Sequence, residues 1–237
     1  MASARPFVLL TCEHGGNDVP ARYRALFTGH QDLLQSHRGW DPGALDWARL
    51  AAKSLKAPLI EHKITRLLVE LNRSRRHPAL FSGISRVLPP AERERLISDT
   101  YTPWRDAVEA QLRKATRRGR VFHISAHSFT PSLNGETRNA DIGLLYDPRR
   151  KSESDFCRAW QNEITAIRPD LRIRRNYPYR GAADGFTTYL RKAVGPRYSG
   201  IELEINQRFP LGPSGDWKKL KCDTIAALQA TLTAFGV

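Results

Sequence analysis

Short apolar runs rich in β-branched and aromatic residues alternate along this chain with segments of helical periodicity. Parallel strands cannot be joined by a tight turn, so a connection of about a dozen residues or more, usually a helix, must link them. The alternation therefore predicts an α/β fold with a largely parallel sheet and helices on both faces. The expected strands are residues 7–14, 58–62, 64–71, 121–127, 141–146, 172–175 and 199–205, and the expected helices are 20–34, 44–55, 90–118, 153–167, 187–194 and 217–235.

Local signals refine this pattern. Asp41 followed by Pro42 is typical of a helix N-cap with proline just inside it, so we expect the helix to open there. Pro103 predicts a break between two helices within residues 90–118. Residues 172–175 are expected to form an edge strand.

The size and composition favour one domain over residues 1–237. No run approaches the length of about 18 apolar residues that spans a bilayer, and the N-terminus lacks the pattern of a signal peptide. The three cysteines, Cys12, Cys157 and Cys222, are well separated and form no CxxC pair. Such cysteine usage is typical of a reducing compartment, so we expect a cytoplasmic protein without a membrane partner.

The chain is strongly basic, with 38 Lys and Arg against 24 Asp and Glu and a formal net charge of +14. A positive field attracts anions, either phosphate backbones or small carboxylates. The basic residues are spread, with small clusters at 73–76, 113–120 and 172–180. A nucleic-acid interface favours a contiguous basic stripe, so we expect a generally basic surface and disfavour a nucleic-acid-binding module.

Two of the expected strands end on a histidine. His14 lies between an acid and two glycines, which would let a backbone and a ligand approach closely, and His127 ends the run that starts at residue 121. Loops at the carboxyl ends of strands are where ligands bind in open α/β sheets, so the two imidazoles predict a metal site. A catalytic zinc needs about three protein ligands. The candidates for the third are Asp41, Asn17 and Glu13, whereas His123 is interpreted as a structural residue.

Arg66 and the pair Asn72-Arg73 form a second group of polar residues, on the expected strand 64–71 and at its end. Arginine binds a carboxylate through two parallel hydrogen bonds, which fixes orientation as well as charge. The group therefore predicts a carboxylate-binding site at the same sheet edge as the histidines. The alternative is a solvated strand end.

The expected strand 199–205 carries two acids on one face. Period-two alternation places Glu202 and Glu204 together and the apolar residues between them on the opposite face. An acid near a metal-bound water can act as general base and then as general acid. Without a metal, the same pattern would be the polar face of an edge strand.

Seven groups of residues together resemble the N-formylglutamate amidohydrolase family, and more distantly the aspartoacylase and zinc carboxypeptidase group. They occur in the family's order and extend to about residue 207. The matching segments are Cys12-Glu-His-Gly-Gly-Asn17, Asp41-Pro-Gly-Ala44, Arg66 to Ser74, Ser125-Ala-His-Ser128, Asn139-Ala-Asp-Ile-Gly-Leu-Leu-Tyr-Asp147, Asn176-Tyr-Pro-Tyr-Arg-Gly181 and Ile201 to Gln207.

The resemblance implies a single-domain three-layer α/β/α fold with a mainly parallel, mixed central sheet, similar to phosphorylase/hydrolase folds. It also implies a metal-dependent hydrolase with one zinc per chain, which cleaves the N-acyl bond of a small acidic amino acid such as N-formylglutamate. His14 and His127 would bind the zinc. Glu204 would take a proton from the zinc-bound water and return it to the leaving amine, while zinc would polarise the acyl carbonyl.

The resemblance further implies that basic residues hold the substrate. Asn72 and Arg73, together with Arg66, would bind its carboxylates, with Arg180 as a further candidate and Arg138 as a weaker one. The partner would then be a small anionic N-acyl amino acid. The same residues also fit a metal amidase that acts on a peptide or a cell-wall amide, because loops 129–140 and 176–187 would shape the pocket.

The third metal ligand departs from the aspartoacylase pattern. That pattern is His-x-x-Glu, and Asn17 stands where the glutamate would be. We favour Asp41, because similar hydrolases with a His-Gly-Gly start look to take a carboxylate from the helix that follows. Glu13 is the alternative, although a neighbour of His14 on a strand should point to the opposite face.

Overall fold

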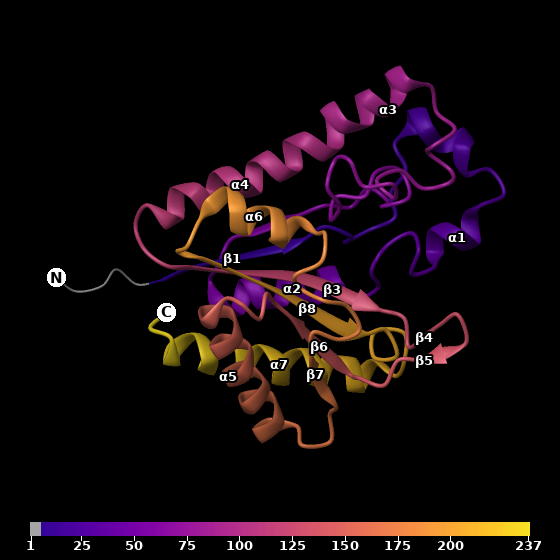
Figure 1. Ribbon diagram of the computed structural model, residues 1–237. Coiled ribbons are helices and arrows are strands. Elements are labelled where there is room, and N and C mark those ends of the chain that lie inside the picture. The colour runs from indigo at the N-terminus through magenta and orange to yellow at the C-terminus, as the bar shows by residue number, and fades with distance from the viewer. Residues whose placement is uncertain (1–5) are drawn as a thin grey trace.

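The computed structural model describes residues 6–237, which form a central six-stranded sheet with helices on both sides (Figure 1). The strands of this sheet are β1 (Phe7–Cys12), β2 (Leu59–Glu61), β3 (Val121–Phe129), β6 (Ile142–Leu145), β7 (Ile173–Arg175) and β8 (Tyr198–Asn206). Their order is β2-β1-β3-β8-β6-β7. Neighbouring strands are parallel except β6 and β8, so the predicted mainly parallel, mixed sheet is confirmed.

The remaining elements cover or connect these strands. The α-helices are α1 (Gln31–Gln35), α2 (Ala44–Leu55), α3 (Pro90–Leu96), α4 (Thr102–Thr116), α5 (Lys151–Ile167), α6 (Phe186–Val194) and α7 (Ser214–Ala234). A 3-10 helix spans Ala21–Phe27, and a small separate hairpin consists of β4 (Ser132–Leu133) and β5 (Glu136–Thr137).

The helices form one layer on each face of the sheet (Figure 1). Helices α2, α5 and α7 pack on one face, and α4 and α6 pack on the other. Because side chains alternate along a strand, even-numbered residues of β3 and odd-numbered residues of β8 enter the core beneath α2, α5 and α7. The opposite face of these two strands carries the polar side chains His123, Ser125, His127, Glu202 and Glu204.

Strand β8 lies at the centre of the sheet, between β3 and β6. The alternative in which Glu202 and Glu204 belong to a solvated edge strand is therefore wrong, because both side chains are buried. Strand β7 does lie at an edge, as expected.

Residues 64–71 are not a strand, contrary to the sequence-based expectation. Ile64 makes a single bridge with Asp18, and the chain then turns, with the Leu68 N–H donating to the carbonyl of Thr65. A short buried apolar run has the same composition whether its backbone is extended or turned, which explains the error. The buried apolar side chains of this loop, which pack on the α4 side of the sheet, are Leu67, Leu68, Val69 and Leu71.

Pro103 does not separate two helices. Helix α3 continues through a π-helical segment, Ile97–Tyr101, directly into α4. Proline has no N–H to donate to the carbonyl four residues earlier, and the chain accommodates this with a wider turn just before it rather than with a break.

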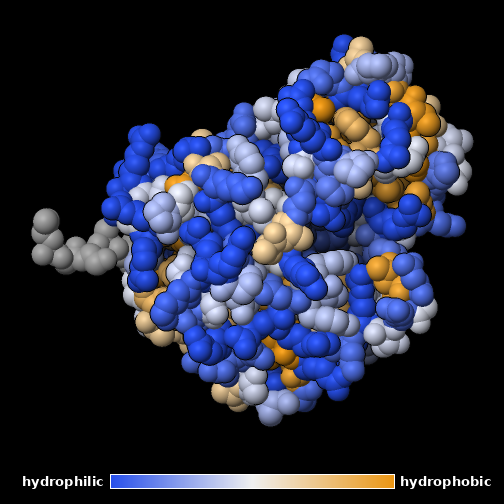
Figure 2. All heavy atoms as spheres, viewed as in Figure 1, coloured by the Kyte–Doolittle hydropathy of each residue, from blue (hydrophilic) through white to orange (hydrophobic). Residues whose placement is uncertain are grey.

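Hydrophilic residues cover most of the face shown in Figure 2, and apolar residues appear there in separate patches. Among residues 6–237, no helix combines the length and the apolar character needed to cross a membrane.

Candidate metal centre and active site

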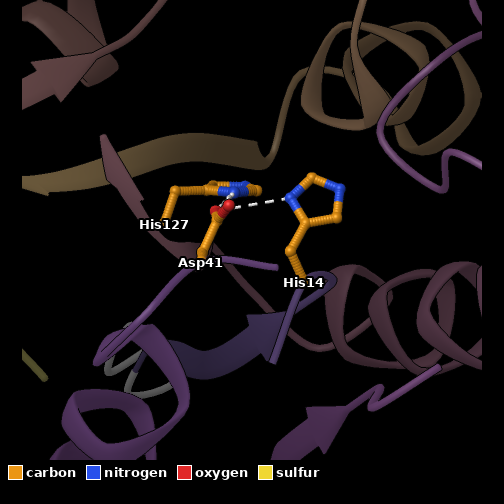
Figure 3. Close-up of side chains that lie close together, drawn as sticks. All are labelled: His14, Asp41 and His127. Carbon is orange, nitrogen blue, oxygen red and sulfur yellow. Dashed lines mark hydrogen bonds and ion pairs between the residues drawn. The ribbon is translucent and has the colours of Figure 1, made fainter. Parts of the chain in front are cut away.

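The two predicted histidines meet at the carboxyl ends of neighbouring parallel strands. His14 follows β1 and His127 lies near the end of β3, and their ring centroids are 5.1 Å apart. Both are buried, with 1% and 3% of their surface exposed. Figure 3 shows both rings next to the carboxylate of Asp41.

Asp41 completes the cluster from the loop before α2. Its Oδ2 atom lies 3.0 Å from His127 Nδ1 and 3.4 Å from His14 Nδ1. The predicted N-cap role is wrong: helix α2 begins after Gly43 (φ +81°) without a side-chain cap, because the Asp41 carboxylate is turned toward the histidines. One ligand atom from each of the three residues lies within 4.8 Å of the others.

The other two candidates for a third ligand point elsewhere. Asn17 Nδ2 donates to the carbonyl of Leu34, away from the histidines. Glu13 accepts hydrogen bonds from Ser125 Oγ and lies 3.6 Å from His127 Nε2, on the side of that ring opposite Asp41. Asp41 is therefore the candidate that the geometry favours.

The glycines after His14 accommodate the chain itself rather than a ligand. A Cβ atom on Gly15 would lie 2.9 Å from the carbonyl oxygen of His62, and one on Gly16 would lie 2.8 Å from that of Lys63. These glycines let the turn after β1 pack closely on the segment after β2.

The ring nitrogens of His14 and His127 that face away from Asp41 make a second set of contacts. His14 Nε2 lies 2.5 Å from Glu70 Oε1, and His127 Nε2 lies 2.9 Å from Ser125 Oγ. Arg66 links the acids, with Nη1 3.0 Å from Asp41 Oδ1 and Nε 2.7 Å from Glu70 Oε2. Sequence reasoning gave Glu70 no role, because its contact with His14 depends on the turned conformation of residues 64–71.

These charges shift the pKa values of the cluster. Burial and Arg66 act to lower the pKa of His14, but the carboxylates of Glu70 and Asp41 outweigh them and raise it. Burial also disfavours charged His127, yet the hydrogen bond that its Nδ1 donates to Asp41 and the nearby acids raise its pKa to about 10. Burial acts to raise the pKa of the two carboxyls, but His14 and Arg66 hold both well below their usual range.

The donor set fits a divalent metal. Two imidazoles and one carboxylate are ligands that a catalytic zinc takes, with a further position left for water or substrate. Metal-binding histidines usually donate their other N–H to a carboxylate, carbonyl or water, which fixes the ring orientation. The contact of His14 with Glu70 is of this kind, and at His127 the hydroxyl of Ser125, which in turn donates to Glu13, takes the corresponding position.

His123, predicted to be structural, lies on the same face of β3 as His127, four residues earlier, and is fully buried. Its Nε2 lies 2.8 Å from Thr11 Oγ1 and its Nδ1 lies 2.7 Å from the Tyr198 hydroxyl. Burial, Arg191 and His127 lower its pKa to about 3. Both of its ring nitrogens are satisfied by hydroxyl groups, which confirms the structural interpretation.

Glu204 lies directly across from His127, in register on the neighbouring strand β8. It is buried, and its Oε2 atom has no hydrogen-bond partner among residues 6–237. Burial raises its pKa to about 8, partly offset by His127, while Asp41 and Glu202 act in the same direction as burial. Glu202 differs, because the hydroxyl of Thr187 bonds its Oε1.

A cavity of about 300 Å³ joins the cluster to the predicted substrate-binding residues. Arg73 lines it with Nη1 2.7 Å from the carbonyl of Asp184, and Asn72 Oδ1 accepts the N–H of Phe186 at 2.6 Å. Arg180 lines the cavity from an exposed position. Arg66 also lines the cavity, but a substrate carboxylate would have to compete with the ion pairs that Arg66 makes with Asp41 and Glu70.

Arg105 supports this wall of the cavity from α4, a role that sequence reasoning missed. Its Nη1 donates to the carbonyls of Leu71 at 2.8 Å and Arg73 at 3.3 Å, on either side of Asn72. The guanidinium is buried, and its Cζ lies 4.2 to 4.8 Å from the centroids of three aromatic rings. These rings belong to Tyr101, Phe186 and Tyr189.

A mainly parallel sheet that brings two histidines, an aspartate and an unpaired glutamate to one cavity is the arrangement of a hydrolase with a candidate metal site. The family model described as N-formylglutamate amidohydrolase matches residues 7–210. The chain belongs to this family and is a hydrolase that acts on amide bonds.

Several solved structures are similar to this chain, to different degrees. The crystal structure of gene product Atu2144 from Agrobacterium tumefaciens superposes with a TM-score of 0.79 at 27% identity, covering 99% of this chain and 93% of that one. An N-acetylmuramoyl-L-alanine amidase from Clostridium difficile 630 gives a TM-score of 0.45 at 12% identity, covering 97% and 98%. A metallo-carboxypeptidase from Burkholderia cenocepacia gives 0.45 at 15% identity, covering 98% and 59%. No curated protein sequence matches the chain.

Proposed function

We propose that the protein is a zinc-dependent amidohydrolase that cleaves the N-acyl bond of a small acidic amino acid, with N-formylglutamate as the reference substrate. The observation that carries this proposal is the position of Glu204, buried and unpaired, in the same cavity as His14, Asp41 and His127. Those three residues would hold one zinc ion per chain. Three free cysteines, two of them buried, are consistent with a place in the reducing cytoplasm.

A bound zinc lowers the pKa of water and polarises the acyl carbonyl. Glu204 supplies the proton transfer. Its Oε2 has no partner within the described chain, so it is available to accept a proton from the attacking water and to return it to the leaving amine. A carboxyl whose pKa is raised toward neutrality is suited to both steps, because neither protonation state is strongly favoured.

Basic and amide side chains would orient the leaving amino acid. Arg73 and Arg180 line the cavity, and no carboxylate of residues 6–237 lies within 4.0 Å of either guanidinium. The amide of Asn72 lines the same cavity. A substrate with two carboxylates would pair with these two guanidiniums, and the overall charge of +14 would attract it.

Hydrolysis assays on the zinc-loaded protein test this proposal. The panel contains N-formyl-L-glutamate, N-acetyl-L-glutamate, N-formyl-L-lysine and a cell-wall muropeptide, and it is run on the wild type, E204Q and the control E163Q. Glu163 is exposed on α5, and its substitution removes the same charge away from the cavity. We expect turnover of the N-acyl glutamates, wild-type zinc content in both variants, and loss of turnover in E204Q alone.

Two outcomes would contradict the proposal. Turnover by E204Q at the wild-type rate would remove Glu204 from the mechanism. Cleavage of the muropeptide but of no N-acyl amino acid would assign the enzyme to a cell-wall amide instead.

A further inference from the structure

A second recess opens beside the cavity of the candidate active site. Its volume is about 250 Å³. It shares four lining residues with that cavity, which are Asp41, Arg66, Ser128 and Tyr179. The residues that line only the second recess are His37, Arg38, Leu67, Phe129 and Thr130. The candidate metal ligand Asp41 thus lines both the cavity of the candidate active site and the second recess.

Arg38 and Arg66 line the second recess, and Asp41, the one carboxylate among its lining residues, is paired with Arg66. No carboxylate of residues 6–237 lies within 4.0 Å of Arg38 or of the neighbouring Arg138. Arg138 Nη1 donates to the hydroxyl of Tyr179 at 3.0 Å, and its Cζ lies 6.0 Å from the ring centroid of Phe129. Partial burial together with Arg138, Arg38 and Arg66 lowers the pKa of His37, as expected beside several cations.

The recess is large for the acyl group that the family's description implies. A water molecule occupies about 30 Å³ in the liquid, and a formyl group is of similar size, so it would fill only a small part of 250 Å³. The first cavity already holds Glu204 and the residues that would orient the leaving amino acid. A substrate whose scissile bond lies at Asp41 would therefore direct its acyl group into the second recess.

We propose that this recess, with Arg38 and Arg138 beside it, binds a carboxylate at the far end of the acyl group. The inference rests on the proposed function and names its substrate class: N-acyl acidic amino acids in which the acyl group is itself a dicarboxylic acid joined through one carboxyl. Hydrolysis consumes one water, breaks the amide C–N bond and forms a C–O bond. The amine leaves with the proton that Glu204 returns, and a free dicarboxylate is the second product.

A matched pair of substrates tests this inference on the zinc-loaded full chain. N-glutaryl-L-glutamate and N-pentanoyl-L-glutamate have acyl chains of equal length and differ in the terminal carboxylate. The variants are R38Q and the control R118Q; Arg118 is exposed at the end of α4 and has no side-chain partner within residues 6–237. The measured quantity is the ratio of kcat/KM for the glutaryl substrate to that for the pentanoyl substrate.

We expect the wild type to favour the glutaryl substrate by about tenfold or more, because a charge-assisted hydrogen bond to arginine is among the stronger ones. R38Q should lower the ratio by about fivefold or more, whereas R118Q should keep the wild-type ratio. A ratio near one in the wild type, or an R38Q ratio equal to that of the wild type, would overturn the inference.

The failure of this inference can be distinguished from failure of the proposed function. If N-formyl-L-glutamate is cleaved and the ratio is near one, only the second recess is wrongly assigned. If no N-acyl glutamate is cleaved, the proposed function fails. Calorimetric titration of the protein with glutarate then tests, independently of turnover, whether the recess binds a carboxylate. Weaker glutarate binding by R38Q than by R118Q would then support the anion site, and equal binding would refute it.

Discussion

Replacing Glu204 with glutamine should make the metal-free protein more stable at alkaline pH. The carboxyl is buried without a partner for Oε2, so folding favours its protonated form and raises its pKa from 4.5 to about 8. A pKa that is raised in the folded state contributes stability that is present below the unfolded value and is lost as pH rises toward the folded value. Glutamine has nearly the same shape and cannot ionise.

The structure sets the size of this effect. A shift from 4.5 to about 8, at roughly 1.4 kcal/mol per pKa unit, corresponds to a loss on the order of 5 kcal/mol between pH 4.5 and pH 8. His127 also has a raised pKa, chiefly through its hydrogen bond to Asp41 and the charges of Glu13 and Asp41, which both proteins keep; Glu204 adds a smaller contribution that E204Q loses. The stability of E204Q relative to the wild type should therefore increase by several kcal/mol from pH 5 to pH 9.

Urea denaturation of the metal-free proteins in the presence of a chelator measures this difference. The wild type, E204Q and E163Q are compared at pH 5 and pH 9, and the exposed Glu163 should give no pH-dependent difference. If E204Q and the wild type differ by the same free energy of unfolding at both pH values, Glu204 is not the buried, unpaired acid described above.

Three further substitutions test the surroundings of the site. E70Q removes the charge next to the imidazole of His14, a candidate metal ligand. Zinc affinity, measured by titration, should therefore fall by about 10- to 100-fold, whereas wild-type affinity would show that this contact is not needed. G143A would place a Cβ 2.1 Å from the carbonyl oxygen of Tyr177, so thermal unfolding should reveal clear destabilisation, and an unchanged melting temperature would refute the close packing. R105M removes the donors that hold the backbone around Asn72, so KM for N-acyl glutamate should rise about tenfold or more with unchanged zinc affinity. Weaker zinc binding in R105M, with KM unchanged, would contradict that positioning role.

The central strands were predictable because their residues follow simple periodic rules. Alternation in β8 places Glu204 on one face and apolar residues on the other, whichever helices cover the sheet. His127 lies near the end of a buried run, and the parallel pairing of β3 with β8 then brings it opposite Glu204. The mainly parallel order follows from helical connections of more than ten residues.

The contacts made by residues 64–71 could not be predicted in the same way. The segment is apolar and buried, which is equally typical of a strand and of a turn packed beneath a helix. Only the turned backbone brings Glu70 to His14 and lets Arg66 reach Asp41. The preference for Asp41 as the third ligand came from the resemblance, since the sequence pattern alone left Asp41, Asn17 and Glu13 as open candidates.

Zinc titration of the metal-free wild type, D41N and N17A tests the central claim most directly. We predict one zinc site per chain in the wild type, wild-type affinity in N17A and a large loss of affinity in D41N, because Asp41 Oδ2 faces both imidazoles while Asn17 bonds to Leu34. A wild-type protein that binds no zinc, or a D41N protein that binds it as tightly as the wild type, would contradict the account.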